Sequence, residues 1–375
     1  MDSKIQLITN LNEFPRVRKS RILKGLCTFC VVLTVLPIFL VLNSFQKSHQ
    51  NIIRIEKDYG IQPQTQPPCT DLVCQRHARI DSALEILESR NISRQAIFFI
   101  ETSGRGTLLP RQLCALESAA RHNPDADIYG LLLDLPADPR LTRDEQVLTL
   151  LRYYGNVRLL WAKSATYFVG TPLQEWNIAN RINTSVNRAE DASDIMRVVT
   201  VLKYGGIYLD LDFVIQQSLT SMPPNWLTFE LGSNPTSSAF GFQKGHPMVN
   251  IMANEQAATF DGSIFGYSGP SMVARVMSRT CGMSLSELFN TGKNCTDIVV
   301  LKPDKFYPIS YPAWRLLFDE SVAGQTMETV RSSLGVHMFN YLSHGANVTL
   351  GSNQAYSQLA QKHCPRAYWS CFKNF

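Results

Sequence analysis

The hydrophobic pattern after residue 95 alternates between short apolar runs and amphipathic stretches. Runs of about four to eight apolar residues are typical of buried strands, whereas the amphipathic stretches repeat with the period of a helix. The pattern predicts strands at Ala96–Ile100, Ile128–Leu135 and Val157–Trp161, separated by helices at Pro110–His122 and Thr142–Tyr154. Such alternation is typical of a parallel, doubly wound α/β sheet, in which ligands bind outside the carboxyl ends of the strands.

One stretch in the middle of the chain passes directly from a helix pattern into a strand pattern. Four apolar residues at i, i+3, i+4 and i+7 give the helix one buried face: Ile195, Val198, Val199 and Leu202. Gly205–Gly206 ends this helix, and Ile207–Leu209 follows as a short apolar strand. Asp210 and Asp212 stand at the carboxyl end of that strand. Because side chains alternate along an extended chain, both carboxylates face the same way.

This pair of carboxylates suits a hard divalent cation. Mn²⁺ and Mg²⁺ bind oxygen ligands and keep coordination positions for water and phosphate oxygens. We therefore predict that Asp210 and Asp212 bind a metal ion that carries a nucleotide diphosphate. The other D-x-D, Asp125–Asp127, follows Asn123–Pro124 in a predicted turn, where acidic side chains are simply solvated. We interpret it as a chance match.

An uncharged apolar run of 18 residues, Gly25–Leu42, precedes the globular pattern. At about 1.5 Å per residue, a helix of this length nearly crosses a hydrocarbon core of about 30 Å. Six basic residues precede the run and only Lys47 follows it closely, so the positive-inside rule leaves the N-terminus in the cytosol. The run is longer than the apolar region of a cleaved signal peptide and no A-x-A-like site follows, which favours an uncleaved anchor.

Composition and charge narrow the class of protein. The chain has 375 residues, of which 45% are hydrophobic and 18% charged, with a net charge of +5. The first 47 residues carry seven Lys or Arg against two acidic residues, so the rest of the chain is neutral overall. The basicity therefore belongs to the segment that flanks the membrane, and we predict no nucleic-acid partner.

These features divide the chain into four segments. We predict a cytosolic tail at 1–24, a transmembrane signal anchor at 25–42, a lumenal stem at 43–92 and a catalytic domain at 93–375. The stem is polar and includes Gln62–Pro68, a semi-extended stretch too poor in apolar residues to form a core.

Seven of the nine cysteines lie beyond the predicted span, where an oxidising lumen permits disulfides. Short spacing favours three pairs, with Cys114 left over and buried, although spacing alone leaves the connectivity open: Cys69–Cys74, Cys281–Cys295 and Cys364–Cys371. These spacings argue against a zinc site. Four N-x-S/T sequons also follow the span, in agreement with a lumenal domain: Asn91, Asn183, Asn294 and Asn347.

The central motif resembles the core of a known enzyme family. Ser193-Asp194-x-x-Arg197, seven residues and then Gly-Gly-Ile-Tyr-Leu-Asp-x-Asp-Phe213 are similar to the α1,4-galactosyltransferase and α1,4-N-acetylglucosaminyltransferase family. Further matches are spread over most of the predicted lumenal part: Ile97–Ser103, Glu117–Arg121, Gly170–Leu173, Gly269–Pro270, Phe306–Ile309, Trp314, His337 and Asn340. The chain departs from the family at Phe339, where Trp is common, and at Tyr267, where His is common; the second departure bears on the identity of the sugar.

The resemblance implies a GT-A type nucleotide-sugar transferase domain, type II topology in the Golgi membrane, a UDP-sugar donor and Mn²⁺ (or Mg²⁺). It also assigns roles to residues. Asp210 contacts the ribose and the metal, Asp212 binds the metal directly, and both are catalytic. His337 is expected to complete the metal or the phosphate site. Asp194 and Arg197 hold the sugar and phosphates of the donor, and Thr102 and Ser103 lie near the uridine. From the residues alone, Asp194 and Arg197 also fit an ordinary i, i+3 surface pair, and His337 a structural histidine.

We therefore predict a retaining α1,4-glycosyltransferase of glycosphingolipid biosynthesis, which moves galactose or N-acetylgalactosamine from a UDP-sugar to a terminal sugar of a glycolipid. One alternative is an α1,4-N-acetylglucosaminyltransferase that acts on glycoprotein glycans, and another is a non-catalytic, sugar-binding or chaperone-like relative. A haloacid-dehalogenase-type phosphatase with Asp210 as nucleophile is disfavoured because the motif falls in the middle of the chain, after the predicted stem. The sequence is compatible with a monomer or a homo-oligomer.

Overall fold

The computed structural model describes residues 81–89, 95–137, 139–140, 144–176, 178–292, 294–371 and 374–375. All of them belong to one compact unit, Arg54–Phe375. The predicted anchor, Gly25–Leu42, and most of the predicted stem lie outside the described residues. Within the described ranges, no helix combines the length and the apolar character that crossing a membrane requires.

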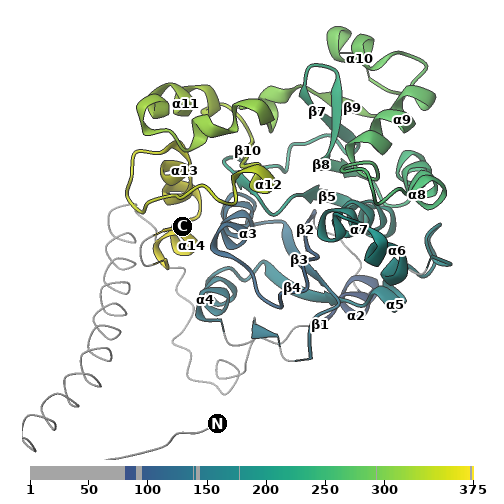
Figure 1. The fold of residues 1–375 in the computed structure, drawn as a ribbon, viewed down its shortest axis with the longest axis horizontal. Helices are drawn as coiled ribbons and strands as arrows, with labels where there is room; N and C mark the ends of the chain where they lie inside the picture. Colours follow the sequence, from purple (N-terminus) through teal and green to yellow (C-terminus); the bar gives the residue numbers. More distant parts are fainter. Residues whose placement is uncertain are drawn as a thin grey trace, which may run out of the picture. The chain divides into compact units, whose positions relative to one another are not determined.

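A mixed eight-stranded sheet forms the middle of this unit, with the strand order β1-β4-β3-β2-β5-β8-β7-β9 (Figure 1). The strands are β1 (Asp81–Ser82), β2 (Ala96–Glu101), β3 (Asp127–Leu133), β4 (Val157–Ala162), β5 (Gly206–Leu209), β7 (Trp226–Leu231), β8 (Asn234–Phe242) and β9 (Val299–Leu301). The strands from β1 to β5 in this order are parallel, as predicted.

The other half of the sheet departs from the prediction. Strand β8 runs antiparallel to both β5 and β7, so the expectation of a wholly parallel sheet is wrong. The cause is local: β7 and β8 are joined by a tight hairpin with Gly232 at φ 57°, and a hairpin can connect only antiparallel strands.

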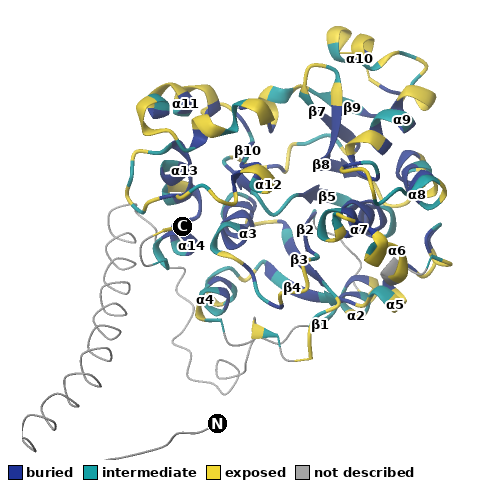
Figure 2. Ribbon diagram, viewed as in Figure 1, coloured by how far each residue is buried: buried dark blue, intermediate teal, exposed yellow. Residues whose placement is uncertain are grey.

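Helices cover both faces of the sheet, and the sequence of β2 reflects this. Ile97 and Phe99 pack into one core with α3 and α13, whereas Phe98 and Ile100 pack into a second core with α7, α8 and α9. Figure 2 shows the central strands as buried and the outward faces of the helices as partly exposed. A strand buried on both faces reads as a continuous apolar run, which is why Ala96–Ile100 was predictable.

The helices follow the strands along the chain. They are α2 (Ala83–Ser89), α3 (Pro110–His122), α4 (Glu145–Tyr153), α5 (Ser164–Tyr167), α6 (Ile178–Thr184), α7 (Arg188–Tyr204), α8 (Pro247–Thr259), α9 (Pro270–Thr280), α10 (Leu285–Thr291), α11 (Ala323–Val330), α12 (Asn340–Ser343), α13 (Ala355–His363) and α14 (Pro365–Trp369), with short 3₁₀ helices η2 (Pro303–Lys305), η3 (Tyr311–Leu317) and η4 (Glu320–Val322). Helix α3 has the predicted bounds, and α2 and β1 come from the end of the predicted stem.

A second, two-stranded sheet brings a distant segment beside the D-x-D. Strand β6 (Phe213–Ile215) follows the D-x-D directly and pairs antiparallel with β10 (Gly335–His337). In this register His337 lies opposite Phe213. A residue more than a hundred positions away in sequence is thereby placed beside Asp212.

Two disulfides test the predicted pairing. The Cys281–Cys295 bond is confirmed, but Cys364 pairs with Cys114 and not with Cys371, so that part of the prediction is wrong. Proximity in sequence misled the prediction, because the chain returns after 250 residues to pack α14 against α3. Cys371 has no disulfide partner among the described residues, and the predicted Cys69–Cys74 pair lies outside them.

Candidate metal and donor site

Two glycines allow the chain to deliver the D-x-D to the edge of the sheet. Gly205 and Gly206 have φ values of 68° and 94°, a region that L side chains rarely adopt. A Cβ on Gly206 would also lie 2.5 Å from the carbonyl oxygen of Ala96. The pair therefore ends α7 and lets β5 lie tightly against β2, so that Asp210 emerges at the carboxyl edge of the sheet.

Three side chains converge at this edge: Asp210, Asp212 and His337. One ligand atom from each lies within 4.8 Å of the others. His337 Nε2 is 3.0 Å from Asp212 Oδ1 and 3.9 Å from Asp210 Oδ2. The predicted pair of carboxylates and the predicted histidine are thus brought together, His337 by the pairing of β10 with β6.

The protein holds one oxygen of each carboxylate and leaves the other directed at His337. Asp210 Oδ1 accepts a 2.6 Å hydrogen bond from the Tyr208 hydroxyl and pairs with Arg197 Nη2 at 3.2 Å. Asp212 Oδ2 accepts a 2.7 Å hydrogen bond from the backbone N–H of Asn340. Oδ2 of Asp210 and Oδ1 of Asp212 are the oxygens near His337. Such partners fix ligand orientation in metal sites.

The state of His337 fits a metal ligand. Its Nε2 is close enough to Asp212 for an ion pair, yet neither ring nitrogen makes a hydrogen bond with acceptable geometry, although both are buried. Burial lowers the pKa of His337, but the carboxylates of Asp212 and Asp210 raise it more, to about 10. A proton on the imidazole therefore compensates the two carboxylates, and a divalent cation would replace that proton.

Asp194 and Arg197 form a buried pair beside the candidate metal ligand Asp210. Arg197 Nη1 lies 3.2 Å from Asp194 Oδ1 and also donates to Ser237. Nε and Nη2 donate to Ser193, and Nη2 pairs with Asp210. Burial lowers the pKa of Arg197, but the Asp210 carboxylate raises it to a net value above the ordinary one. Arg197 therefore bridges two site carboxylates, and its direct contact with a donor stays a prediction.

Asp194 has a tightly packed environment of its own. Burial raises its pKa to about 6 against the opposing effect of Arg197. Its carboxylate lies against Gly269, where a Cβ would come within 2.3 Å of Oδ2. Gln256 Nε2 donates to the carbonyl oxygens of Asp194 and Ser268, which ties the Gly269 loop to α7. The Gly-Pro match in the sequence thus reflects close approach to a carboxylate.

Thr102 and Ser103 directly follow β2, and their place near a uridine stays a prediction. The Thr102 hydroxyl donates a 2.6 Å hydrogen bond to the carbonyl oxygen of Ala189 at the start of α7. The backbone N–H of Ser103 binds Glu101, and the Ser103 side chain is exposed. Thr102 is thus engaged within the protein, whereas Ser103 faces solvent at the edge of the site.

Phe339 adopts an unusual backbone conformation beside the metal ligands. Its φ and ψ are both 52°, in the left-handed region that is unfavourable for a bulky residue. The backbone N–H groups on either side, from Met338 and Asn340, both bind Asp212, and the Phe339 ring packs edge-on against His337. Strain at a position of this kind is typical of a functional site.

Sequence reasoning missed two residues at the site. Tyr208 reads as an apolar strand residue, yet its hydroxyl binds Asp210. Glu230, at the end of β7, accepts a 3.2 Å hydrogen bond from the N–H of Tyr311. Burial raises the pKa of Glu230, while the charges of His337 and Asp212 act on it in opposite directions. No local pattern marks Glu230, because only the hairpin of β7 and β8 brings it near the ligands.

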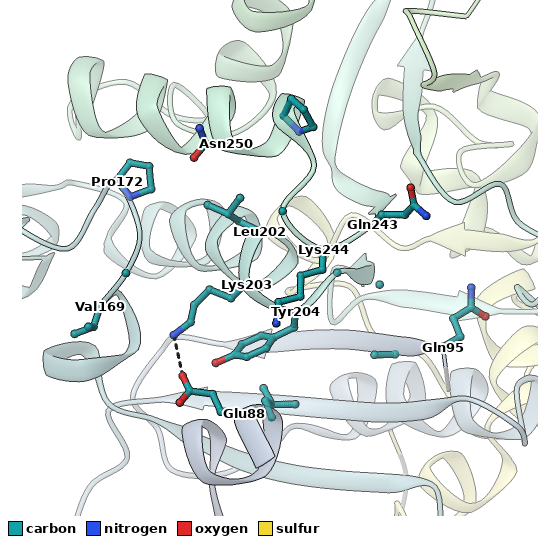
Figure 3. Close-up of a pocket in the computed structure, with 17 residues that line it drawn as sticks. Glu88, Gln95, Val169, Pro172, Leu202, Lys203, Tyr204, Gln243, Lys244 and Asn250 are labelled. Atoms are coloured by element: carbon teal, nitrogen blue, oxygen red, sulfur yellow. Dashed lines mark ion pairs between the residues drawn. The ribbon is translucent and has the colours of Figure 1, made fainter. Parts of the chain in front are cut away.

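A cavity of about 1180 Å³ lies elsewhere, lined in part by Gly205, Gly206 and the Lys203–Glu88 ion pair (Figure 3). Gly206 begins β5, whereas Asp210 follows its end, so this cavity opens at the amino end of the strand. It contains none of the predicted site residues. In a sheet of this type ligands bind at the carboxyl ends of strands, so the converging carboxylates mark the candidate site.

Comparisons with known proteins agree with this geometry. A family model described as the alpha 1,4-glycosyltransferase conserved region matches residues 241–371 and therefore includes His337. A second model, the glycosyltransferase sugar-binding region containing the DXD motif, matches residues 110–230 and includes Asp210 and Asp212. All three residues of the cluster therefore lie within a matched region.

Curated relatives cover most of the chain. Lactosylceramide 4-alpha-galactosyltransferase from Mus musculus is 27% identical over 72% of this chain and 75% of its own length. The Homo sapiens protein of the same name is 28% identical over 72% and 76%. Alpha-1,4-N-acetylglucosaminyltransferase from Homo sapiens is 29% identical over 80% and 87%.

Solved structures resemble this chain loosely. The PaToxG glycosyltransferase has a TM-score of 0.41 and 15% identity over 64% of this chain and 80% of its own. The galactosyltransferase LgtC, in complex with donor and acceptor sugar analogues, has a TM-score of 0.33 and 14% identity over 56% and 74%. By the two matched family regions and the curated relatives, the chain is similar to the α1,4-glycosyltransferases and is a hexosyltransferase.

Proposed function

We propose that this enzyme is a retaining α1,4-glycosyltransferase that transfers galactose or N-acetylgalactosamine from UDP to the terminal sugar of a glycolipid. The observation that carries the proposal is the convergence of Asp210, Asp212 and His337 at the carboxyl edge of the sheet. The names of the lactosylceramide 4-alpha-galactosyltransferases support a glycolipid acceptor. The proposal includes the GT-A class for the domain, with its mixed sheet, and insertion as a type II protein of the Golgi membrane.

The cluster suits Mn²⁺ or Mg²⁺. Asp210, Asp212 and His337 would hold the ion through the two carboxylate oxygens and the imidazole nitrogen that face one another. When bound, a divalent ion stabilises the negative charge that develops on the leaving diphosphate. Oxygen ligands favour either ion, and a single imidazole is compatible with Mn²⁺.

The surrounding residues hold these ligands in position. Tyr208 and Arg197 restrain Asp210, and the N–H of Asn340 restrains Asp212. Arg197 also offsets part of the negative charge of two buried or half-buried carboxylates. We propose that Asp194 contacts the donor sugar, and that Ser103 and Thr102 border the uridine. Prepositioned groups of this kind lower the barrier because they need no rearrangement during the reaction.

The anomeric configuration is retained if the acceptor attacks the sugar on the same face from which UDP leaves. In this step the bond between the sugar C1 and the UDP oxygen breaks, and a bond from C1 to the acceptor oxygen forms on that face. The acceptor hydroxyl proton passes to the leaving phosphate oxygen. This route requires no covalent nucleophile from the protein.

A second candidate is an α1,4-N-acetylglucosaminyltransferase acting on glycoprotein glycans. It is favoured by the human relative of that name, which matches 80% of this chain. The two candidates differ in the group at C2 of the donor sugar, which local hydrogen bonds and space distinguish. A non-catalytic relative is disfavoured because the three ligands and their supporting contacts are intact.

The test is transfer by the full chain from UDP-galactose, UDP-N-acetylgalactosamine and UDP-N-acetylglucosamine, with Mn²⁺, to a lactosyl glycolipid and to a glycoprotein-type glycan. We expect one of the first two donors to give an α1,4-linked product on the glycolipid, identified by NMR. An α1,4 product from UDP-N-acetylglucosamine would select the second candidate. A β linkage, or no transfer from any donor, would refute both.

A further inference from the structure

Exposed large hydrophobic side chains gather on three short segments near the site. Six of the ten in the described residues come from these segments: Ile264, Phe265, Tyr311, Leu316, Tyr341 and Leu342. Helix α12, which carries the last two, contacts η3, which carries Tyr311 and Leu316. Single exposed hydrophobic side chains are normally scattered over a protein surface. Where several of them gather in one patch, the patch often marks a binding site.

Phe265 and Tyr341 form the centre of this surface. Their ring centroids are 4.5 Å apart with an angle of 29° between the planes, so the rings are stacked. They are nevertheless 52% and 55% exposed. An aromatic pair that stays half in water presents flat, apolar faces and a hydroxyl to a ligand.

Each ring is carried by a segment that is fixed to a carboxylate of the donor site. Tyr341 directly follows Asn340, whose N–H binds Asp212. Phe265 lies four residues before Gly269, which packs against the Asp194 carboxylate. The stacked pair therefore joins the two sides of the site, within a few residues of the metal ligand on one side and of Asp194 on the other.

Both segments are also rigid. Arg111 from α3 binds Asn340 Oδ1 and the carbonyl oxygen of Ser343, and thereby holds α12 in place. In the other segment, consecutive backbone hydrogen bonds from Tyr267 to Ile264 and from Gly269 to Gly266 fix the loop that presents Phe265. A platform that is already ordered binds a ligand without the cost of ordering loops.

We propose that the stacked pair of Phe265 and Tyr341 binds the acceptor sugar, with a pyranose ring lying on its exposed face. One face of a hexopyranose is lined with C–H groups, which carry slight positive charge and attract the negative face of an aromatic ring. The polar edges of the sugar need hydrogen-bond partners. The Glu230 carboxylate at the end of β7, which accepts a hydrogen bond from the N–H of Tyr311, is one such partner. This inference rests on the proposed function and specifies where its acceptor binds.

The donor is a less suitable occupant of this platform. The charged diphosphate is drawn to the metal ligands, whereas the aromatic pair carries no charge. An acceptor sugar must lie next to the donor sugar for its hydroxyl to attack, and a platform carried by segments that contact Asp212 and Asp194 fits this requirement.

The test is binding of soluble hexosides, including a β-lactoside, to the full chain by calorimetry in the presence of UDP and Mn²⁺. We expect Tyr341→Ala and Phe265→Ala to weaken binding about tenfold, which corresponds to about 1.4 kcal/mol. Tyr341→Phe keeps the ring and should bind within about twofold of wild type. Val169→Ala removes a side chain of similar exposure at the other end of the sheet and should have no effect.

Hydrolysis of the UDP-sugar without acceptor is measured on the same variants, and we expect it to be unchanged. This measurement separates the proposed function from the proposed acceptor platform. If wild type does not hydrolyse the UDP-sugar, the proposed donor chemistry is wrong, whereas the platform is tested by hexoside binding alone. The platform is overturned if wild type binds no hexoside or if both alanine variants bind as wild type does.

Discussion

Replacing Tyr208 by Phe removes a hydroxyl from the candidate metal site, where it also lies 3.3 Å from Ser193 Oγ. The hydroxyl donates to Asp210 Oδ1 at 2.6 Å, and burial raises the pKa of Tyr208 so that the donor proton is retained. Phenylalanine fills the same volume, and the Arg197 guanidinium, 4.7 Å from the ring centroid, keeps its contact with the ring. The variant therefore tests the restraint on Asp210 with little change in packing.

The expected magnitude follows from the contacts that remain. A hydrogen bond to a charged group contributes about 1.5 to 3 kcal/mol, and loss of a partner that orients a metal ligand reduces metal affinity by about 10- to 100-fold. Arg197 still binds the same oxygen at 3.2 Å, so we expect the lower end of that range. Mn²⁺ affinity should fall about tenfold.

Tyr204→Phe provides the matched control. Its hydroxyl is buried, with no hydrogen-bond partner in the described part of the chain, and it lies at the end of α7 away from Asp210. Mn²⁺ affinity is measured by calorimetry in the presence of UDP, together with the Mn²⁺ dependence of UDP-sugar hydrolysis. Equal Mn²⁺ affinity in the two variants would refute the role of Tyr208 in orienting Asp210.

Three further predictions follow from contacts away from the metal ligands. Gly269→Ala places a Cβ against the Asp194 carboxylate and should reduce donor turnover at least tenfold, whereas Gly155→Ala, which enters open space, should not; equal activities would contradict the packing argument. Removing the Cys114–Cys364 disulfide, with its separation of 250 residues, should lower the free energy of unfolding by about 5 kcal/mol in the chain-entropy model. Removing Cys281–Cys295, separated by 14, should cost about 3 kcal/mol, and the reverse order in denaturant unfolding would be inconsistent with that model. Burial lowers the pKa of His363 to about 3, below its unfolded value of about 6.5, so its stabilising effect is complete above about pH 6.5 and decreases as the pH falls. Burial also lowers the pKa of His122, which lies 2.8 Å from His363, to about 4, so His122 adds a loss of its own. The loss of stability between pH 7 and pH 5, measured by thermal unfolding, should be smaller by about 2 kcal/mol in His363→Gln, and an identical loss in both proteins would reject this origin.

The parts of the fold that sequence alone could predict are those with a local signal. The continuous apolar run at Ala96–Ile100 and the helical period in α3 identify buried elements. Both signals are local, because residues close in sequence are also close within one strand or helix. The same holds for Asp210 and Asp212, which share a face because they are two residues apart on extended chain.

The remaining features depend on contacts between distant segments. His337 reaches the site only through the pairing of β10 with β6, and its role came from a family resemblance and not from its neighbours. Glu230 depends on the hairpin of β7 and β8, and the Cys114–Cys364 disulfide on the return of the C-terminal helices to α3. No periodicity in the sequence records such pairings.

The account depends most on the claim that Asp212 binds the ion required for hexosyl transfer. The most direct test is UDP-sugar hydrolysis and transfer by the full chain with Mn²⁺ or with EDTA, in wild type, Asp212→Asn and Asp125→Asn. The last variant changes the first residue of the other D-x-D, which lies in the turn before β3. We predict that wild type turns over the UDP-sugar, that EDTA abolishes this turnover and that excess Mn²⁺ restores it. Turnover should be lost in Asp212→Asn and unchanged in Asp125→Asn. Turnover at the wild-type rate in EDTA, or in Asp212→Asn, would contradict the account.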